Sequence, residues 1–337
     1  MRVVVQGPGA IGSWLAARLT LSAAVTDSVL LLDRSDARAA RLTAQGIMVE
    51  PTASNSESGG EATVVPVTVS GPAGLSDFGS VAVGSGKSEF WMVCVKHGDL
   101  EDAIAAGRAW VSPEAQLLVL TNGLGHDRWL GESWPADQVW LGTTTYGVLS
   151  EAEGRVRPMG FGAIRLGPLR TLSDSKDESL ALAAMLRNAE LTVETVDDVD
   201  ALLWEKAIVN CAINPVAALT RTTNGALRDS AAYEVTRALV RETVDVFTAH
   251  RRERGATPPA PTDWIEVVDE VCRRTATNRC SMLRDLERGR KTEIDALNLA
   301  VASRAEELGL PAPLNRALGA LVRAAEASPT ETKPPAA

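Results

Sequence analysis

An apolar segment in the second half of the chain carries three polar side chains at intervals of four residues: Lys206, Asn210 and Asn214. Side chains at i, i+4 and i+8 lie on one face of an α-helix, so an ammonium group and two amides would share a stripe. A lysine in such a helix is costly to bury unless it has a partner or a task. Two plainer explanations stay open. Lys206 could pair with a carboxylate that lines the core, and the asparagines could cap or bridge helices.

The N-terminal residues contain the glycine pattern G-x-G-x-x-G, formed by Gly7, Gly9 and Gly12. The pattern follows a β-rich apolar run at residues 2–5 and opens a helical pattern, which is the context that favours a dinucleotide-binding loop. The first glycine permits a tight turn, the second lets a pyrophosphate approach the helix N-terminus, and the third allows close helix–sheet packing. An ordinary glycine-rich turn in an α/β domain is the alternative. The residues of this loop that we expect to bind the dinucleotide cofactor are Gly7, Gly9, Ala10, Ile11 and Gly12.

The end of the second predicted strand, residues 29–32, bears on the choice between the two nicotinamide cofactors. Asp33 could accept a hydrogen bond from the ribose 2′-hydroxyl of NAD, whereas Arg34 could pair with the 2′-phosphate of NADP. Ser35 and Arg38 could add donors to a phosphate. We favour NADPH, while NADH stays open because of Asp33. A solvated Asp-Arg pair at a strand end is the plain alternative.

Two further polar positions follow predicted parallel strands. Lys96 ends the apolar run 90–95, and Asn122 follows the run 117–120. Because ligands of open α/β sheets bind beyond the carboxyl ends of strands, both residues are candidate cofactor contacts. A surface charge at a strand end explains Lys96 equally well.

The last third of the chain carries weaker candidates. Asn278 and Ser281 are three residues apart, so they would share a helix face. Glu293 lies in the segment K-T-E-I-D, where charges surround an isoleucine. From the residues alone, we expect Glu293 to be a solvated acid on a helix.

The order of patterns predicts two domains. Strand-like runs and a βαβ opening occupy the first part, whereas amphipathic helical patterns dominate from about residue 197 to 327. We therefore expect an α/β fold with an N-terminal Rossmann-type dinucleotide-binding domain at residues 1–197 and an all-α domain at residues 198–327. Residues 328–337 are expected to form a disordered tail.

Within the first domain, the apolar runs 90–95, 117–120 and 140–145 are typical of buried strands, and residues 155–167 suggest a hairpin. Residues 51–88 are rich in Gly, Ser, Pro and Thr. We expect them to form short strands and a loose insertion at the edge of this domain.

The composition narrows the class of protein. The chain has 337 residues, 45% of them hydrophobic, and a net charge of -9, which argues against a nucleic-acid partner. No apolar run approaches the roughly 20 residues that span a bilayer, and the N-terminus lacks the features of a signal peptide. We therefore expect a cytoplasmic protein without a membrane partner. Four cysteines without a C-x-x-C pair indicate reduced structural thiols, and three scattered histidines argue against a metal site or a serine triad.

Taken together, the motifs resemble those of the ketopantoate reductase (2-dehydropantoate 2-reductase) family over nearly the full length. The matching pieces run in the family's order: the N-terminal G-x-G-x-x-G, V-C-V-K, T-N-G-L-G, G-T-T-T, W-E-K-A-I-V-N-C-A-I-N-P, N-G-A-L-R, S-M-L-R-D and K-T-E-I-D. Each piece is weak alone, but their combination is specific. The resemblance implies that the helical domain is of the 6-phosphogluconate-dehydrogenase C-terminal type.

The resemblance also implies a role for each candidate residue. The family's catalytic lysine falls on Lys206 and its active-site glutamate on Glu293. Arg34 would select the 2′-phosphate and Lys96 would contact the cofactor, although Asp33 departs from the pattern by placing a negative charge beside that phosphate. The implied substrate-binding residues are Asn122, which would also lie near the nicotinamide, Asn210, Asn214, Asn278 and Ser281.

The implied function is the NADPH-dependent reduction of 2-dehydropantoate to (R)-pantoate in pantothenate and coenzyme A biosynthesis, with Lys206 as general acid. Reduction of another small 2-keto acid by the same residues stays open, as does a non-catalytic NADP(H)-binding sensor. A homodimer is also left open.

Overall fold

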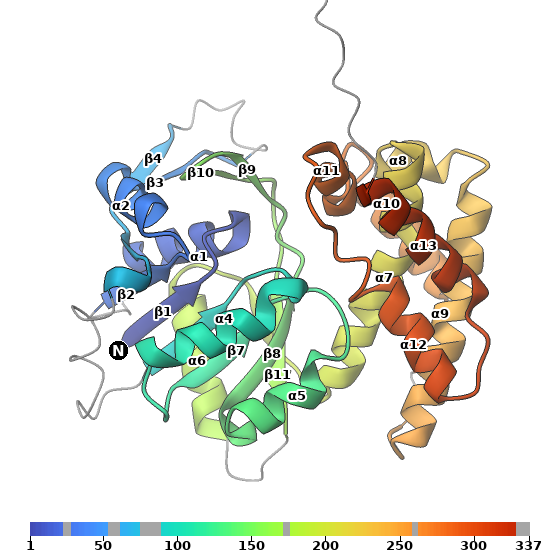
Figure 1. Cartoon of the computed structure of the whole chain (residues 1–337), viewed down its shortest axis with the longest axis horizontal. Helices are drawn as coiled ribbons and strands as arrows, with labels where there is room; N and C mark the ends of the chain where they lie inside the picture. Colours follow the sequence, from blue (N-terminus) through green and yellow to red (C-terminus); the bar gives the residue numbers. More distant parts are fainter. Residues whose placement is uncertain (23–27, 53–60, 75–88, 171–175, 258–261, 328–337) are drawn as a thin grey trace, which may run out of the picture. The chain divides into compact units, whose positions relative to one another are not determined.

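The computed structural model describes residues 1–22, 28–52, 61–74, 89–170, 176–257 and 262–327 (Figure 1). Contacts divide the chain into two compact units. The first contains Met1–Thr121 and His126–Leu202, and the second contains Asn122–Gly125 and the residues from Leu203 onward. Helix α7 (Val199–Thr220) contributes residues to both units. The domain boundary expected at residue 198 stays a prediction.

The first unit is built on an eight-stranded sheet in the order β12-β11-β8-β7-β6-β1-β2-β5. The strands are β1 (Arg2–Gln6), β2 (Ser28–Leu32), β5 (Thr68–Ser70), β6 (Glu89–Val93), β7 (Gln116–Val119), β8 (Val139–Thr144), β11 (Ile164–Pro168) and β12 (Val193–Thr195). The strands from β5 to β8 are parallel, whereas β11 is antiparallel to β8. Because β2 lies on one side of β1 and β6 on the other, the strand order reverses at β1. Open α/β sheets bind ligands at such a point, so the predicted Rossmann-type fold is confirmed.

The central strands are buried on both faces, as parallel strands are when other elements cover both sides of a sheet. Val3 and Val5 of β1 pack with Trp14 and Leu15 of α1 in one core cluster. On β6, Trp91 instead packs edge-to-face against the ring of Trp134. The helices of this unit are α1 (Ala10–Leu21), α2 (Asp36–Gln45), α4 (Leu100–Gly107), α5 (His126–Ser133) and α6 (Lys176–Asn188), and the 3-10 turns are η2 (Pro72–Gly74), η3 (His97–Asp99), η4 (Arg108–Trp110) and η5 (Ala136–Gln138).

A smaller sheet in the order β4-β3-β10-β9 accompanies the large one, and helix α1 contacts strands of both sheets. Its strands are β3 (Ile47–Val49), β4 (Thr63–Val65), β9 (Val148–Ala152) and β10 (Arg155–Pro158). The hairpin predicted at residues 155–167 is wrong, because β10 pairs with β9 and β11 pairs with β8 in the other sheet. The hairpin turn lies at Gly154, whose φ of 71° favours glycine. The sequence indicated which segments form β-strands but not which strands pair with each other.

The short strands expected within residues 51–88 are confirmed as β4 and β5, and β5 forms an edge strand of the large sheet. Residues 53–60 and 75–88 of that segment lie outside the described residues, as does the predicted tail at 328–337. All four cysteines are free, and Cys211, Cys272 and Cys280 are buried.

The second unit contains helices and, among its described residues, no strand. Besides α7, the helices are α8 (Asn224–Arg228), α9 (Tyr233–Glu253), α10 (Trp264–Arg274), α11 (Ser281–Glu287), α12 (Asn298–Glu307) and α13 (Pro313–Ala327). Helix α7 is long and apolar enough to cross a membrane by composition, but 67% of its apolar window is buried, as in a core helix. Because most of this window is buried inside the protein, its apolar composition is weak evidence for a membrane-spanning helix.

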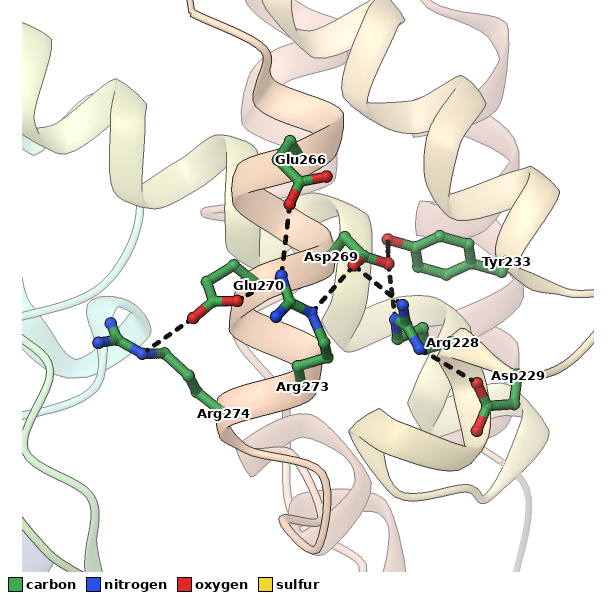
Figure 2. A network of polar contacts seen from close by, with 8 residues as sticks. All are labelled: Arg228, Asp229, Tyr233, Glu266, Asp269, Glu270, Arg273 and Arg274. Carbon is green, nitrogen blue, oxygen red and sulfur yellow. Dashed lines mark hydrogen bonds and ion pairs between the residues drawn. The ribbon is translucent and has the colours of Figure 1, made fainter.

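An ion-pair network joins α8 to α10 in this unit (Figure 2). The Arg228 guanidinium donates to both carboxylate oxygens of Asp269, with Nε–Oδ1 and Nη2–Oδ2 distances of 2.7 and 3.2 Å. The Asp269 carboxylate also accepts from Arg273 and from the Tyr233 hydroxyl. The hydrogen bond from Arg228 holds the pKa of Asp269 below its ordinary value. This network fixes the short helix α8 against α10, which precedes the loop that carries Asn278.

Candidate active site

The three polar side chains of the stripe lie on helix α7 as predicted. Lys206, Asn210 and Asn214 are each partly exposed, in a helix that is otherwise mostly buried. The most deeply buried residues of α7 are Ala207, Ile208, Cys211, Ala212, Ala217 and Ala218. The stripe is therefore a line of polar groups along the accessible side of a core helix.

Lys206 and Glu293 interact electrostatically within the second unit. Burial lowers the pKa of Lys206, and the negative charge of Glu293 opposes that change. The Oε2 atom of Glu293 accepts a hydrogen bond from Asn122 Nδ2 at 3.0 Å. An ammonium group that gives up its proton more readily than a solvated lysine, beside a carboxylate that favours its charged form, is suited to general acid chemistry.

Glu293 does not lie on a helix, so the expectation of a solvated helix acid is wrong. It is partly buried in the turn that precedes α12. Its carbonyl accepts from the amides of Ala296 and Leu297, each at 3.1 Å. The amide of Leu124 donates to the Ala296 carbonyl at 2.9 Å. Segment 122–125 is thus attached to this turn through both its backbone and the Asn122 side chain. Only that tertiary contact brings Asn122 and Glu293 together.

Asn298 connects this turn to helix α7 and was not predicted as a site residue. Pro215 has no amide hydrogen, so the carbonyl of Cys211, four residues earlier, lacks its usual helical donor. The Asn298 Nδ2 atom donates to that carbonyl at 3.0 Å and to Asn315 Oδ1 at 2.9 Å. Asn298 is the first residue of α12 and is fully buried. A proline inside an apolar helix was the only signal that such a donor would be needed.

Asn278 and Ser281 do not share a helix face, because α11 begins at Ser281 and Asn278 lies in the preceding loop. Between them, Cys280 caps α11 by accepting a hydrogen bond from the Leu283 amide at 3.4 Å. The same sulfur donates to the carbonyl of Asn214 at 3.6 Å. Cys280 therefore attaches the start of α11 to the polar stripe of α7, a role that sequence reasoning missed.

The backbone of Asn278 is fixed by two hydrogen bonds. Its carbonyl accepts from the Asn224 amide at 3.0 Å, and its own amide donates to the Thr275 carbonyl at 2.8 Å. The Asn224 side chain is buried and donates to Thr275 Oγ1 at 2.8 Å. Asn224 belongs to the N-G-A-L-R motif and holds the loop in place.

In the first unit, the glycine loop has the shape that a pyrophosphate requires. Gly7 has a φ of 102°, and its amide donates to the Leu32 carbonyl at 3.2 Å. A Cβ atom on Gly12 would lie 2.0 Å from the Gly7 carbonyl oxygen, so only glycine permits this packing. Among the described residues, a Cβ atom on Gly9 would meet nothing within 4 Å. No side chain from this part of the chain caps the first turn of α1, which starts with Ala10 and Ile11. The loop is closed towards the sheet and open above Gly9, so it fits a dinucleotide.

The remaining cofactor candidates lie beyond the strand ends. Strand β6 ends at Val93, so Lys96 does not end the strand as predicted but precedes η3 as its N-cap residue. The Arg34 side chain follows β2 and is 89% exposed, with Nη1 at 3.9 Å from Asp99 Oδ1. Such an exposed pair contributes little free energy, so a phosphate could displace Asp99 from Arg34.

Comparisons with known proteins agree with this architecture. Family models described as ketopantoate reductase PanE/ApbA and as its C-terminal region match residues 3–171 and 198–326. The chain is 34% identical over 328 residues to a 2-dehydropantoate 2-reductase from Halobacterium salinarum, covering 97% of this chain and 99% of that protein. A PanE/ApbA family ketopantoate reductase structure from Ralstonia eutropha JMP134 matches with a TM-score of 0.78 and 28% identity, covering 97% and 98% of the two chains.

A structure of D-mandelate dehydrogenase with NADH and anilino(oxo)acetate matches with a TM-score of 0.81 at 21% identity, covering 97% and 98% of the two chains. This likeness shows the fold alone.

A mostly parallel sheet with a glycine loop at its switch point, followed by a helical unit in which a lysine and a glutamate interact, is the architecture of an NAD(P)-dependent oxidoreductase. The chain belongs to the ketopantoate reductase family. It is an oxidoreductase that acts on CH–OH groups.

Proposed function

We propose that this chain reduces 2-dehydropantoate to (R)-pantoate with NADPH, in the cytoplasm, as a step of pantothenate and coenzyme A biosynthesis. Its relative from Halobacterium salinarum, which it matches over nearly its whole length, carries the name 2-dehydropantoate 2-reductase. The observation that carries the proposal is the pair of Lys206 and Glu293. Burial lowers the pKa of the lysine, and the negative charge of the carboxylate opposes that change.

In this proposal, Lys206 is the general acid. The reduced nicotinamide, when bound, supplies a hydride to C2 of the keto acid. Negative charge then develops on the ketone oxygen, and the Lys206 ammonium stabilises that charge and donates its proton to the oxygen. Lys206 is left as a neutral amine and regains a proton from solvent. Glu293 orients the ammonium and accepts a hydrogen bond from the primary hydroxyl of the substrate.

The neutral donors of the second unit would position the substrate. Amide and hydroxyl groups can hold a carboxylate without adding a further buried charge, and correct orientation alone contributes several kcal/mol to a rate enhancement. Cys280 and Asn224 support this role, because they fix the backbone around two of these donors. The proposed substrate-binding residues are Asn122, Asn210, Asn214, Asn278 and Ser281.

The first unit would hold the cofactor. The open space above Gly9 suits a pyrophosphate beside the amides of the first turn of α1, which no side chain of the described residues caps. We assign Arg34 to the 2′-phosphate on the basis of its exposed guanidinium. The proposed cofactor-binding residues are Gly7, Gly9, Ala10, Ile11, Gly12, Arg34, Lys96 and Asn122.

A steady-state assay with ketopantoate and NADPH, followed by the loss of NADPH absorbance, tests the proposal. The Lys206→Ala variant should lose at least about a hundredfold in turnover, the usual scale for a lost general acid, and still bind NADPH. Lys291→Ala removes the same charge from an exposed position and should retain wild-type turnover. Near-normal turnover by Lys206→Ala would refute the assignment.

The same assay with a panel of 2-keto acids separates the two alternatives. If another keto acid gives a higher specificity constant, that acid is the substrate, and the proposed hydride and proton transfer still applies. NADPH binding without turnover of any keto acid would indicate a sensor, for which a coupled lysine and glutamate would have no use.

A further inference from the structure

Asp33 is the residue at which this chain departs from the expected NADPH-binding pattern. Its side chain is only 1% exposed. Its Oδ1 atom accepts a hydrogen bond from the Ser35 amide at 3.0 Å, and Oδ2 lies 3.3 Å from Arg38 Nε. Both carboxylate oxygens therefore face protein groups, and the carboxylate is not presented to solvent beyond the strand end.

Arg38 connects this carboxylate to the glycine loop. Its Nη2 atom donates to the carbonyl of Pro8, between the first two glycines of the loop, at 2.7 Å. The carboxylate of Glu153 is also nearby, with Oε2 at 3.6 Å from Arg38 Nε. However, Glu153 accepts two shorter bonds from Arg41, at 2.8 and 3.1 Å. The closest charged partner of Arg38 is thus Asp33.

We infer that Arg38 determines cofactor choice indirectly, by neutralising Asp33 and holding it inside the protein. A carboxylate exposed at this position would accept a hydrogen bond from the ribose 2′-hydroxyl of NAD and would repel the 2′-phosphate of NADP. When Arg38 pairs with Asp33, the carboxylate neither binds the hydroxyl nor repels the phosphate. The exposed Arg34 can then bind the phosphate. Arg38 is thus a positioning residue rather than a phosphate ligand. This inference rests on the proposed binding of NADP(H) at the glycine loop, and its residues all belong to the first unit.

The size of the effect follows from the charges. Without Arg38, a carboxylate with one full charge would lie near a phosphate with up to two, and such a repulsion weakens binding by about tenfold in a partly solvated site. The lost bond to Pro8 should weaken both nucleotides alike, because both carry the pyrophosphate. The ratio of the two dissociation constants therefore isolates the contribution of Asp33.

The test measures dissociation constants for NADP⁺ and NAD⁺ by calorimetry, without any turnover. In Arg38→Ala, the ratio of Kd for NADP⁺ to Kd for NAD⁺ should rise by about tenfold or more. In the double variant Arg38→Ala/Asp33→Asn, the ratio should return to within about threefold of the wild-type value. Arg41→Ala is the matched control, since it removes the same charge from the same helix while bonding to Glu153. It should leave the ratio unchanged.

Other results would overturn the inference. If the double variant keeps a tenfold defect for NADP⁺, Arg38 contacts the phosphate itself. If Arg41→Ala has the same effect as Arg38→Ala, only the net charge of α2 matters. If Arg38→Ala does not fold, the double variant, which has no buried unpaired carboxylate, still decides between these possibilities. A chain that prefers NADP⁺ but does not reduce ketopantoate would refute the proposed substrate and leave this inference intact. A wild-type preference for NAD⁺ would refute both.

Discussion

Replacing Glu293 by glutamine separates the charge of this residue from its shape. Glutamine retains an oxygen that can accept the hydrogen bond from Asn122, which measures 3.0 Å in the native chain. It removes the negative charge that raises the pKa of Lys206, so the lowering effect of burial remains unopposed. The pKa of Lys206 should therefore fall, and the ammonium form should be lost at a lower pH than in the wild-type chain.

The magnitude follows from the loss of one attractive charge pair in a partly buried site, which is on the order of 1–3 kcal/mol. A difference of about 1.4 kcal/mol changes the ratio of ammonium to amine tenfold at a given pH. The specificity constant reports the protonation state of the free enzyme. On the alkaline side, kcat/KM for ketopantoate should thus be about tenfold lower in Glu293→Gln, beyond any loss seen at lower pH.

The assay is a profile of kcat/KM against pH for the wild type, Glu293→Gln and Asp295→Asn. Asp295 is two residues from Glu293 and exposed, and it accepts a hydrogen bond from Arg323 at 2.7 Å. Its replacement removes the same charge from the same turn and should leave the profile in place. If the alkaline limb of Glu293→Gln does not move, or moves equally in Asp295→Asn, the coupling between Glu293 and Lys206 does not control the proton.

Three further changes test the surrounding structure. Gly9→Ala should leave the thermal midpoint of the nucleotide-free chain nearly unchanged, because its Cβ would meet nothing within 4 Å, but should weaken calorimetric NADP⁺ binding by about tenfold or more; wild-type affinity would refute the predicted position of the pyrophosphate. Asn298→Ala should cost about 1–3 kcal/mol in urea unfolding, since it leaves the Cys211 carbonyl without a donor, and a loss below about 1 kcal/mol would contradict that role. His126 is fully buried, and its ring nitrogens have no hydrogen-bond partner among the described residues. Burial, aided by the nearby His97, lowers its pKa to about 3, so the unfolded chain binds the proton more tightly and stability falls as the pH drops from about 6.5 towards 3. In His126→Phe, the decrease of the thermal midpoint with falling pH should therefore be smaller, and an unchanged decrease would show that another group causes it.

Several features could be predicted because they depend on local sequence. The glycine loop is one, since the turn at Gly7 and the packing of Gly12 require glycine wherever a strand leads into a helix in this way. The polar stripe of α7 is another, because helix periodicity alone places Lys206, Asn210 and Asn214 on one face. The resemblance to a family added Glu293, which its own neighbours had suggested to be a solvated acid.

Other features could not be predicted because they depend on pairing between distant segments. The strands β10 and β11 were expected to form a hairpin, but each found its partner in a different sheet. Periodicity placed Asn278 and Ser281 on one helix, whereas the capping bond of Cys280 starts α11 only at Ser281. The order of residue types along the chain does not show which distant backbone groups will form hydrogen bonds with one another.

The sequence by itself determined the class of fold and the order of its elements, because these depend on short-range periodicity and on glycines with a steric purpose. Tertiary structure alone decided what the ambiguous charges do. Asp33 and Arg34 adjoin in the sequence, yet Asp33 is buried against Arg38 while Arg34 is exposed. Glu293 and Asn122 are far apart in the sequence, yet they share a hydrogen bond. The free energy of a charge depends on its solvation and on its nearest partner, and only the folded chain brings distant partners within a few ångströms.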